Sequence, residues 1–143
     1  MSYRKEFRST KVEWDVPDDL PQVEIDANRF RQVFVNLYTN ALDAMGPGGT
    51  LTLRTRHNAD ALRVDVTDSG SGMPAQILDR IFEPFFTTKT SGKGTGLGLS
   101  VTHGIVTKHG GSITCTSRPG EGATFTLRIP TRARAPGQAA AYA

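Results

Sequence analysis

The fold of this chain is decided by the stretch between residues 68 and 100, which reads DSGSGMPAQILDRIFEPFFTTKTSGKGTGLGLS. It opens with a DSGSG turn at 68–72, passes an aromatic FEPFF box at 82–86 and closes with GTGLGLS at 94–100. Residues 74–82 can form a short helix, whereas 83–96 are polar and glycine-rich without periodicity. Apolar residues return to helical spacing over 97–109. The stretch therefore predicts a short helix, a long loop and a second helix.

Upstream of this stretch, the sequence predicts a helix flanked by strands. Asp26 is a good N-cap, and apolar residues recur at helical spacing from Asn28 to Met45 before the run stops at GPGG. Residues 50–56 and 61–67 alternate with period two, as paired strands do, and the second strand leads directly into Asp68. A weaker alternation at 11–16 predicts one earlier strand.

Downstream, residues 112–117 and 123–129 predict two closing strands around the turn PGEG. The order of elements predicts an α/β (α+β) two-layer sandwich, in which a mixed sheet is covered on one face by about three helices. We expect an N-terminal extension at 1–9 and one domain at 10–130 with a lid at about 83–97. The tail at 131–143 is rich in Ala, Arg and Pro, and we expect it to be disordered.

The composition fits one compact domain, since 143 residues with 37% hydrophobic content can bury a core without staples. The formal charge of +3 is spread over both ends and gives little support to nucleic-acid binding. No apolar run approaches the roughly 20 residues that span a bilayer, so we expect a cytoplasmic domain without membrane contact. The single cysteine, Cys115, lies in an alternating strand and is predicted to be a buried thiol.

A polar stripe accompanies the apolar one on the first long helix. Asn36, Asn40 and Asp43 fall at i, i+4 and i+7, so they share one side of the helix. The stripe can be a solvated edge. Alternatively, the amide oxygen of Asn40 can bind Mg²⁺, a hard cation that usually shares its shell with nucleotide phosphates.

The DSGSG turn has two readings. Asp and Gly are ordinary turn residues after a strand. As a binding site, the Asp68 carboxylate would accept a hydrogen bond from the exocyclic amine of adenine, which would select ATP over GTP. Gly70 and Gly72 would then let the backbone approach the base closely.

The glycine-rich loop precedes a helix N-terminus, which is a natural anion site. It is either a flexible linker or a phosphate cradle, in which Lys89, Lys93 and Thr95 stand among Gly92, Gly94, Gly96 and Gly98. Common phosphate motifs do not fit, because the first glycine of a P-loop is missing and Leu99 replaces the last glycine of GxGxxG.

Three phenylalanines, Phe82, Phe85 and Phe86, flank Pro84 at the start of this loop. They can be core residues or the hinge of a cover over a nucleotide. The three histidines have irregular spacing without accompanying cysteines or carboxylates, so they predict no metal site.

Five motifs in this order resemble the catalytic, ATP-binding domain of bacterial sensor histidine kinases, in the wider family of gyrase-type, Hsp90-type and MutL-type ATPases. The motifs are QVFVNLYTNALDAM, DSGSGMP, IFEPFFTTK, GTGLGLS and GEGATFTLRIP, and they cover residues 10 to 130. FEPFFTTK with IVTKHGGSI is most similar to the nitrogen-regulation type of kinase. The resemblance implies the Bergerat-type ATP-binding fold, with ATP and Mg²⁺ as cofactors.

The resemblance also implies roles for individual residues. Asn40 would be the metal ligand, Asn36 would support the phosphates or the metal, and Thr124 would help hold Asp68 and a water at the adenine. Asp43 stands where some related kinases carry a basic residue. The remaining nucleotide-binding residues that the resemblance implies are Gly70, Gly72, Met73, Phe86, Lys89, Lys93, Gly94, Thr95, Gly96, Leu97, Gly98 and Leu99.

Hydrolysing members of the wider family resemble one another in placing a glutamate where this chain has Asn36, a poor general base. The resemblance therefore implies transfer of the ATP γ-phosphate to a histidine. We expect that histidine in the dimerisation domain of a parent kinase, which can itself be membrane-anchored, with a response regulator as an indirect partner and the isolated domain a monomer. An ATPase module, an anti-sigma-type serine kinase and a non-catalytic nucleotide-binding module remain as alternatives.

Overall fold

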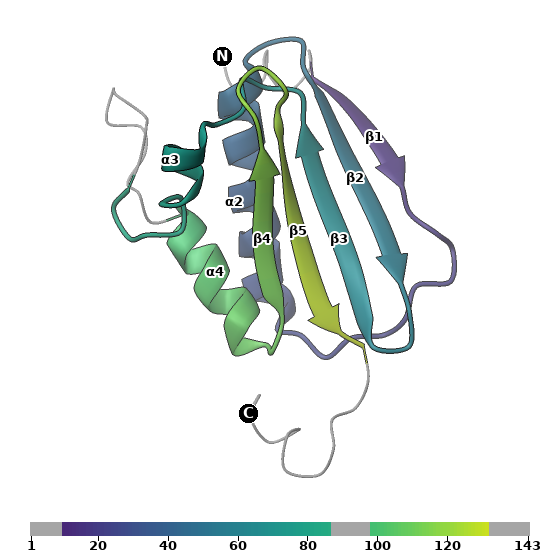
Figure 1. Cartoon of the computed structure of the whole chain (residues 1–143). Coiled ribbons are helices and arrows are strands. Elements are labelled where there is room, and N and C mark those ends of the chain that lie inside the picture. The colour runs from purple at the N-terminus through teal and green to yellow at the C-terminus, as the bar shows by residue number, and fades with distance from the viewer. Residues whose placement is uncertain (1–9, 87–97, 132–143) are drawn as a thin grey trace.

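The structure, a computed structural model, describes residues 10–86 and 98–131 (Figure 1). Its elements follow the predicted order, with small shifts at their ends. They are β1 (Lys11–Asp15), α2 (Ala27–Met45), β2 (Thr50–His57), β3 (Ala61–Asp68), α3 (Ala75–Leu78), α4 (Gly98–Lys108), β4 (Ser112–Ser117) and β5 (Ala123–Pro130).

The strands form one five-stranded sheet in the order β1-β2-β3-β5-β4. The β1–β2 pair is parallel and the other pairs are antiparallel, so the sheet is mixed. Helix α2 lies behind this sheet, and α3 and α4 lie beside its β4 edge (Figure 1). The predicted two-layer α+β sandwich with a mixed sheet is confirmed.

Helix α2 forms because its ends are capped and one of its sides is apolar. The Asp26 carboxylate accepts the Asn28 and Arg29 N–H groups over 3.0 and 3.2 Å, as predicted for an N-cap. The helix ends at Gly46, whose φ of +63° cannot continue it. Its buried side chains recur at helical spacing along one side: Phe30, Val33, Leu37, Ala41 and Leu42.

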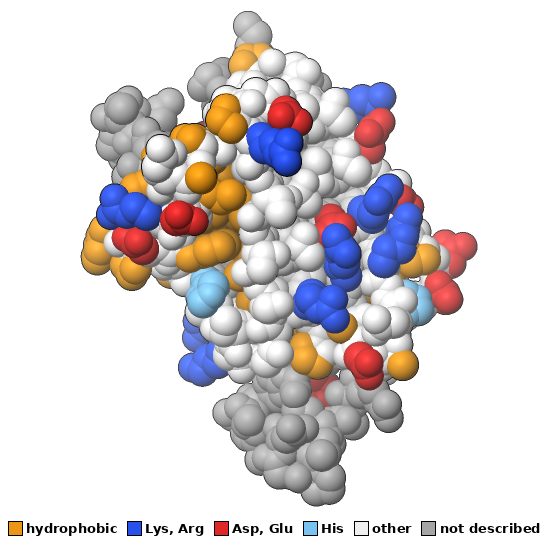
Figure 2. Space-filling model, in the orientation of Figure 1, with side chains coloured by type: hydrophobic (Ala, Val, Ile, Leu, Met, Phe, Trp, Pro, Cys, Tyr) orange, Lys and Arg blue, Asp and Glu red, His pale blue; other side chains and the backbone are white. Residues whose placement is uncertain are grey.

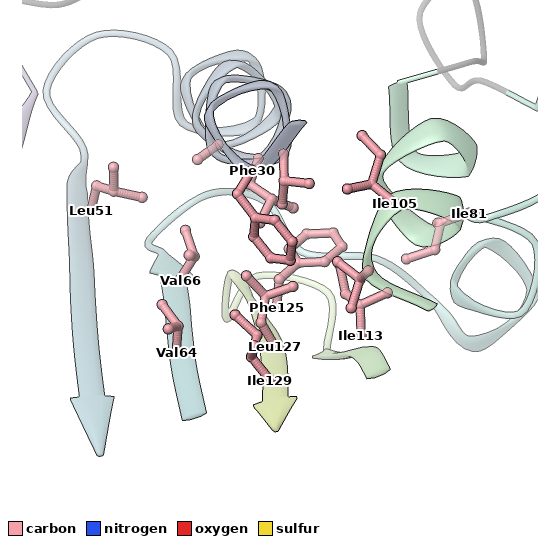
Figure 3. Close-up of a cluster of buried hydrophobic side chains, with 14 residues drawn as sticks. Phe30, Leu51, Val64, Val66, Ile81, Ile105, Ile113, Phe125, Leu127 and Ile129 are labelled. Atoms are coloured by element: carbon pink, nitrogen blue, oxygen red, sulfur yellow. The ribbon is translucent and has the colours of Figure 1, made fainter. Parts of the chain in front are cut away.

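The core lies between α2, α4 and the covered face of the sheet (Figure 3). On β3, alternate residues from Val64 through Val66 to Asp68 are buried. On β5, the odd-numbered residues from Ala123 to Ile129 are buried in the same way. Since side chains alternate between faces of a strand, Asp68 belongs to the helix-covered face, at its end.

The other face of the sheet is polar and turned to solvent. Asp15 on β1 accepts from Arg54 over 3.2 Å and from Arg56 over 2.8 Å, and these bonds tie the edge strand to β2. Thr126 on β5 donates to Asp65 on β3 over 2.7 Å. In Figure 2 this face carries scattered charged groups, whereas hydrophobic side chains gather beside it over the α3 region.

Several predicted boundaries differ. The helix expected at 74–82 is only Ala75–Leu78, because i→i−3 hydrogen bonds such as Arg80 N–H to Ile77 O, 2.9 Å, tighten the following residues into turns before Pro84. Strand β1 ends one residue early, at Asp15. Thr131, predicted to begin the tail, still donates from its N–H to Asp60 O over 3.1 Å. The rest of the predicted tail and the extension at 1–9 lie outside the described residues.

Among the helices in the described ranges, none is long and apolar enough to cross a membrane.

Candidate functional site

The polar stripe predicted on α2 runs between the start of α4 and the DSGSG turn, which are the two ends of the candidate site. Asn36, Asn40 and Ala44 follow at intervals of four residues, so each lies about 6 Å further along the helix axis than the last. The Asn36 amide donates to the carbonyl oxygen of Gly98, the first residue of α4, over 3.1 Å. The Ala44 carbonyl oxygen accepts from the Ser71 N–H over 3.3 Å. Asn40 therefore lies between the start of α4 and the DSGSG turn.

Of the predicted residues on this helix, Asn36 and Asn40 are half-buried, whereas Asp43 is exposed in the last turn. Neutral amides thus occupy the sheltered part of the stripe. Asp43, the only carboxylate of the three predicted residues, lies on the solvent side of the stripe.

The DSGSG turn packs against the β4–β5 hairpin through backbone atoms. Gly72 has a φ of +69°, and a Cβ there would overlap the carbonyl oxygen of Arg118. From the hairpin, a Cβ on Gly122 would overlap the carbonyl oxygen of Asp68. Because only glycine has the space and the backbone freedom for these approaches, the two segments depend on glycine at both positions.

Asp68 ends β3 with 6% of its surface exposed, and among the described residues it is the only buried one with a charged side chain. One carboxylate oxygen accepts the Gly70 N–H over 2.9 Å. Burial raises the pKa of Asp68, while backbone hydrogen bonds from Gly70 and Ala123 act in the opposite direction. A carboxylate has room for further hydrogen bonds, so Asp68 can accept another donor at this end of the site.

The structure does not bring the Thr124 hydroxyl to Asp68. Thr124 is paired with Thr67, and their hydroxyl oxygens lie 2.9 Å apart. Neighbouring residues of a strand point to opposite faces, so these hydroxyls lie on the open face of the sheet. The residue of β5 that stands opposite Asp68 in the register is Ala123.

Sequence reasoning missed the support of the turn by Ser117. Its hydroxyl accepts the Met73 N–H over 2.8 Å and donates to the Gly122 carbonyl oxygen over 2.7 Å. The Met73 side chain, a predicted site residue, is half-buried and packs against the core. No pattern in the sequence marks Ser117, because the link joins segments that are far apart along the chain.

The phenylalanine box divides between the core and the surface. Phe82 and Phe86 are half-buried and pack against the core, and the Arg80 guanidinium carbon lies 4.5 Å from the centre of the Phe86 ring. Phe85 is 74% exposed and has a φ of +68°, which is unusual for a residue with a side chain. The core interpretation therefore applies to Phe82 and Phe86, whereas the cover interpretation stays a prediction for the exposed Phe85.

The predicted phosphate loop is described only at its end. Gly98 begins α4, and Leu99 packs against the core. The remaining predicted loop residues, which are Lys89, Lys93, Gly94, Thr95, Gly96 and Leu97, lie outside the described residues.

Thr102 was also missed by sequence reasoning. It is fully buried on α4, and its hydroxyl donates to the Gly98 carbonyl oxygen over 2.8 Å. The Asn36 amide lies 3.2 Å from the same hydroxyl oxygen. A threonine three residues before the apolar pair Ile105–Val106 could have signalled a polar group on the buried side of the helix.

The groups present fit a nucleotide that brings its own cation. Within residues 10–86 and 98–131, no group of three His, Cys, Asp or Glu residues could hold a metal ion by itself. The Asn36 and Asn40 amide oxygens are neutral, hard ligands that suit Mg²⁺ when other oxygens complete its shell. A thiolate is not offered nearby, because burial, and then the charge of Asp68, raise the pKa of Cys115 to about 12.

A model of a known protein family matches most of this chain. A family model described as histidine kinase-, DNA gyrase B- and HSP90-like ATPase matches residues 25–133. That range includes every predicted site residue.

Two curated relatives are sensor kinases. The sensor histidine kinase ZraS of Escherichia coli (strain K12) is 44% identical over 123 residues, which cover 86% of this chain and 26% of ZraS. The sensor kinase CckA of Brucella abortus is 48% identical over 127 residues, which cover 78% of this chain and 13% of CckA. The chain thus spans only a small part of the relatives it matches.

Solved structures of similar fold are histidine kinases as well. The catalytic domain of histidine kinase ThkA superposes with a TM-score of 0.78 at 35% identity, over 90% of this chain and 84% of that domain. ThkA in complex with the response regulator TrrA gives a TM-score of 0.75 at 31% identity, over 91% of this chain and 36% of the other.

Proposed function

The chain belongs to the family of histidine kinase-, DNA gyrase B- and HSP90-like ATPases, and from this premise we propose that it is the ATP-binding catalytic domain of a sensor histidine kinase. In this proposal it binds ATP with Mg²⁺ and transfers the γ-phosphate to a histidine side chain of the parent kinase's dimerisation domain.

The observation that carries the proposal is the α2 stripe, which runs from a group that can bind adenine to groups that can bind phosphates. At one end lies a buried carboxylate, Asp68, beside the turn that contacts Ala44. At the other end, Asn36 contacts the start of α4. Adenine and phosphates lie at opposite ends of ATP, so one molecule could occupy both ends with Asn40 beside the phosphates.

Each of these groups has a distinct task. The Asp68 carboxylate accepts a hydrogen bond from the adenine amine, which favours adenine over guanine. The Asn40 amide oxygen binds the cation, and Mg²⁺ when bound neutralises charge on the phosphates. The N–H groups at the start of α4 face an anion favourably, because the dipole of the helix is positive there.

Transfer is favoured over hydrolysis by the chemistry at Asn36. An amide is a poor base, and its nitrogen already donates to Gly98 and Thr102. Asn36 therefore cannot take the role of the base that activates a water molecule. A histidine nitrogen needs no such activation when it is positioned in line with the phosphate.

The partners in this proposal are the acceptor-histidine dimerisation domain and, indirectly, a response regulator. The curated relatives are sensor kinases, and ThkA has been solved with a response regulator. We propose that the isolated domain is monomeric and cytoplasmic, without nucleic-acid or membrane contact of its own.

The test is to mix the domain with Mg²⁺-ATP labelled on the γ-phosphate and a separately produced dimerisation domain from the parent kinase. The expected result is label on the dimerisation domain that is stable to alkali and labile to acid, as phosphohistidine is. The same mixture with the acceptor histidine changed to alanine is the control.

Other outcomes would overturn the proposal in identifiable ways. Steady release of phosphate without any partner would indicate an ATPase module. Acid-stable label would indicate a serine kinase. Normal ATP binding without transfer under any condition would indicate a non-catalytic module.

A further inference from the structure

Thr102 forms a buried polar contact between α4 and α2. It has no exposed surface, and its neighbours in the core include Ile105 and Val106 on the same helix. Three hydrogen bonds form a triangle there: Thr102 Oγ1 to Gly98 O at 2.8 Å, Asn36 Nδ2 to Gly98 O at 3.1 Å, and Asn36 Nδ2 to Thr102 Oγ1 at 3.2 Å.

The chemistry of this triangle permits one orientation of the Asn36 amide. The Gly98 carbonyl oxygen can only accept hydrogen bonds. The Thr102 hydroxyl has one proton, and it is donated to that carbonyl, so its oxygen can only accept from Asn36. Both neighbours therefore require a donor from Asn36, and the NH₂ group must face them.

The orientation decides what Asn36 offers to a ligand. With its nitrogen held by Gly98 and Thr102, the amide presents its oxygen away from α4. Among the described residues, no hydrogen-bond partner of this oxygen is seen. An amide oxygen attracts a cation or its bound water, whereas an amide NH₂ group would attract a phosphate.

We propose that Thr102 is a positioning residue for the bound cation: by holding the nitrogen of Asn36, it keeps the Asn36 oxygen directed toward the metal side of the site. The proposal rests on the Mg²⁺-ATP binding proposed above. It also decides between the two roles open for Asn36, in favour of the metal rather than the phosphates.

The chain offers a matched set of variants. Thr102→Val removes the hydroxyl at nearly constant shape, and Thr102→Ser keeps it. Thr107→Val is the control on the same helix. The Thr107 hydroxyl makes the same kind of bond to the carbonyl four residues earlier, His103 O at 2.9 Å. Thr107 is exposed, however, and lies at the opposite end of α4 from Gly98, which Asn36 contacts.

The experiment measures binding of a non-hydrolysable ATP analogue by calorimetry, first in EDTA and then across a Mg²⁺ titration. Thr102→Val is expected to raise the Mg²⁺ concentration for half-maximal effect about fivefold, the equivalent of one hydrogen bond. Its binding in EDTA should be unchanged, and Thr102→Ser and Thr107→Val should match the unmodified chain in both conditions.

Two results would overturn the inference. If Thr102→Val weakens binding equally in EDTA and in Mg²⁺, the hydroxyl has a structural role only. If Thr102→Val and Thr102→Ser give the same Mg²⁺ dependence while the unmodified chain responds to Mg²⁺, the inference is wrong and the proposed function stands. An unmodified chain that binds the analogue without any response to Mg²⁺ would overturn both.

Discussion

The two ends of the candidate site are held by different kinds of contact. At the base end, where adenine is proposed to bind, the DSGSG turn and the β4–β5 hairpin meet through backbone atoms, with Gly72 and Gly122 at the closest approaches. At the phosphate end, where the phosphates are proposed to bind, side chains join α2 to α4, with Asn36 bonded to Gly98 and Thr102. The closest backbone approaches leave no room for a side chain at Gly72 or Gly122, whereas the side-chain contacts can be changed stepwise. Substitution of these glycines should therefore act on stability, and substitution of the polar side chains at either end should act on ligand binding.

The largest effect is expected where the backbone contact is closest. Gly72→Ala should destabilise the domain by about 2–5 kcal/mol, because it combines a left-handed backbone with an overlap against the Arg118 carbonyl. Urea unfolding followed by circular dichroism measures this. Gly120→Ala is the control, since Gly120 has a φ of +79° but no atom within 4 Å of the added Cβ. Equal losses in the two variants would show that the close approach is unimportant.

The next largest effect is on binding at the base end. Asp68→Asn should weaken ATP binding by about 1–3 kcal/mol, because a charged acceptor for the adenine amine is lost. Asp65→Asn makes the same chemical change on the open face of the same strand and should leave binding unchanged. Titration with ATP measures both, and an unchanged affinity in Asp68→Asn would remove Asp68 from the site.

At the phosphate end, Asn40→Ala should act on the cation rather than on the fold. The tightening of ATP binding by Mg²⁺ should fall about tenfold, or 1.4 kcal/mol, because an amide oxygen ligand is lost. Thr39→Ala, at the neighbouring exposed position, is the control. Calorimetry with and without Mg²⁺ measures the difference, and an undiminished response to Mg²⁺ in Asn40→Ala would refute the metal role.

The smallest effect sharpens the comparison through pH. Burial raises the pKa of Asp68 above 3.8, so the folded state holds this proton more tightly than the unfolded state. That contribution to stability is complete below 3.8 and is lost as the pH rises through the raised pKa. Asp68→Asn cannot lose a proton. Without nucleotide, it should therefore gain stability relative to the unmodified chain as the pH rises from 3 to 7, measured as the difference in Tm. A constant difference would contradict the burial argument.

Patterns local in sequence predicted most of the fold. The apolar spacing of α2 was sufficient because its buried stripe, including Phe30 and Val33, repeats every three to four residues. Alternation in β3 and β5 was sufficient for the same reason, with a period of two. The short helix α3 was predicted too long, because the i→i−3 bonds that replace helical ones after Leu78 depend on local geometry rather than periodicity.

For the candidate site, the sequence by itself determined which groups are available. The order of Asn36, Asn40 and Asp68 and the glycines that follow them are properties of the chain, and they identify the family. Helical periodicity also put the two asparagines on one side of α2, because four residues make about one turn.

Only the tertiary structure decided how those groups are held and turned. The strand register puts Ala123 rather than Thr124 opposite Asp68, and the packing of α4 on α2 brings Thr102 to Asn36, 66 positions away in the chain. Register and helix packing arise from contacts between distant segments, and spacing along one segment carries no information about them. The sequence thus predicted the candidate ligands of the site, whereas the orientation of the Asn36 amide came from the fold.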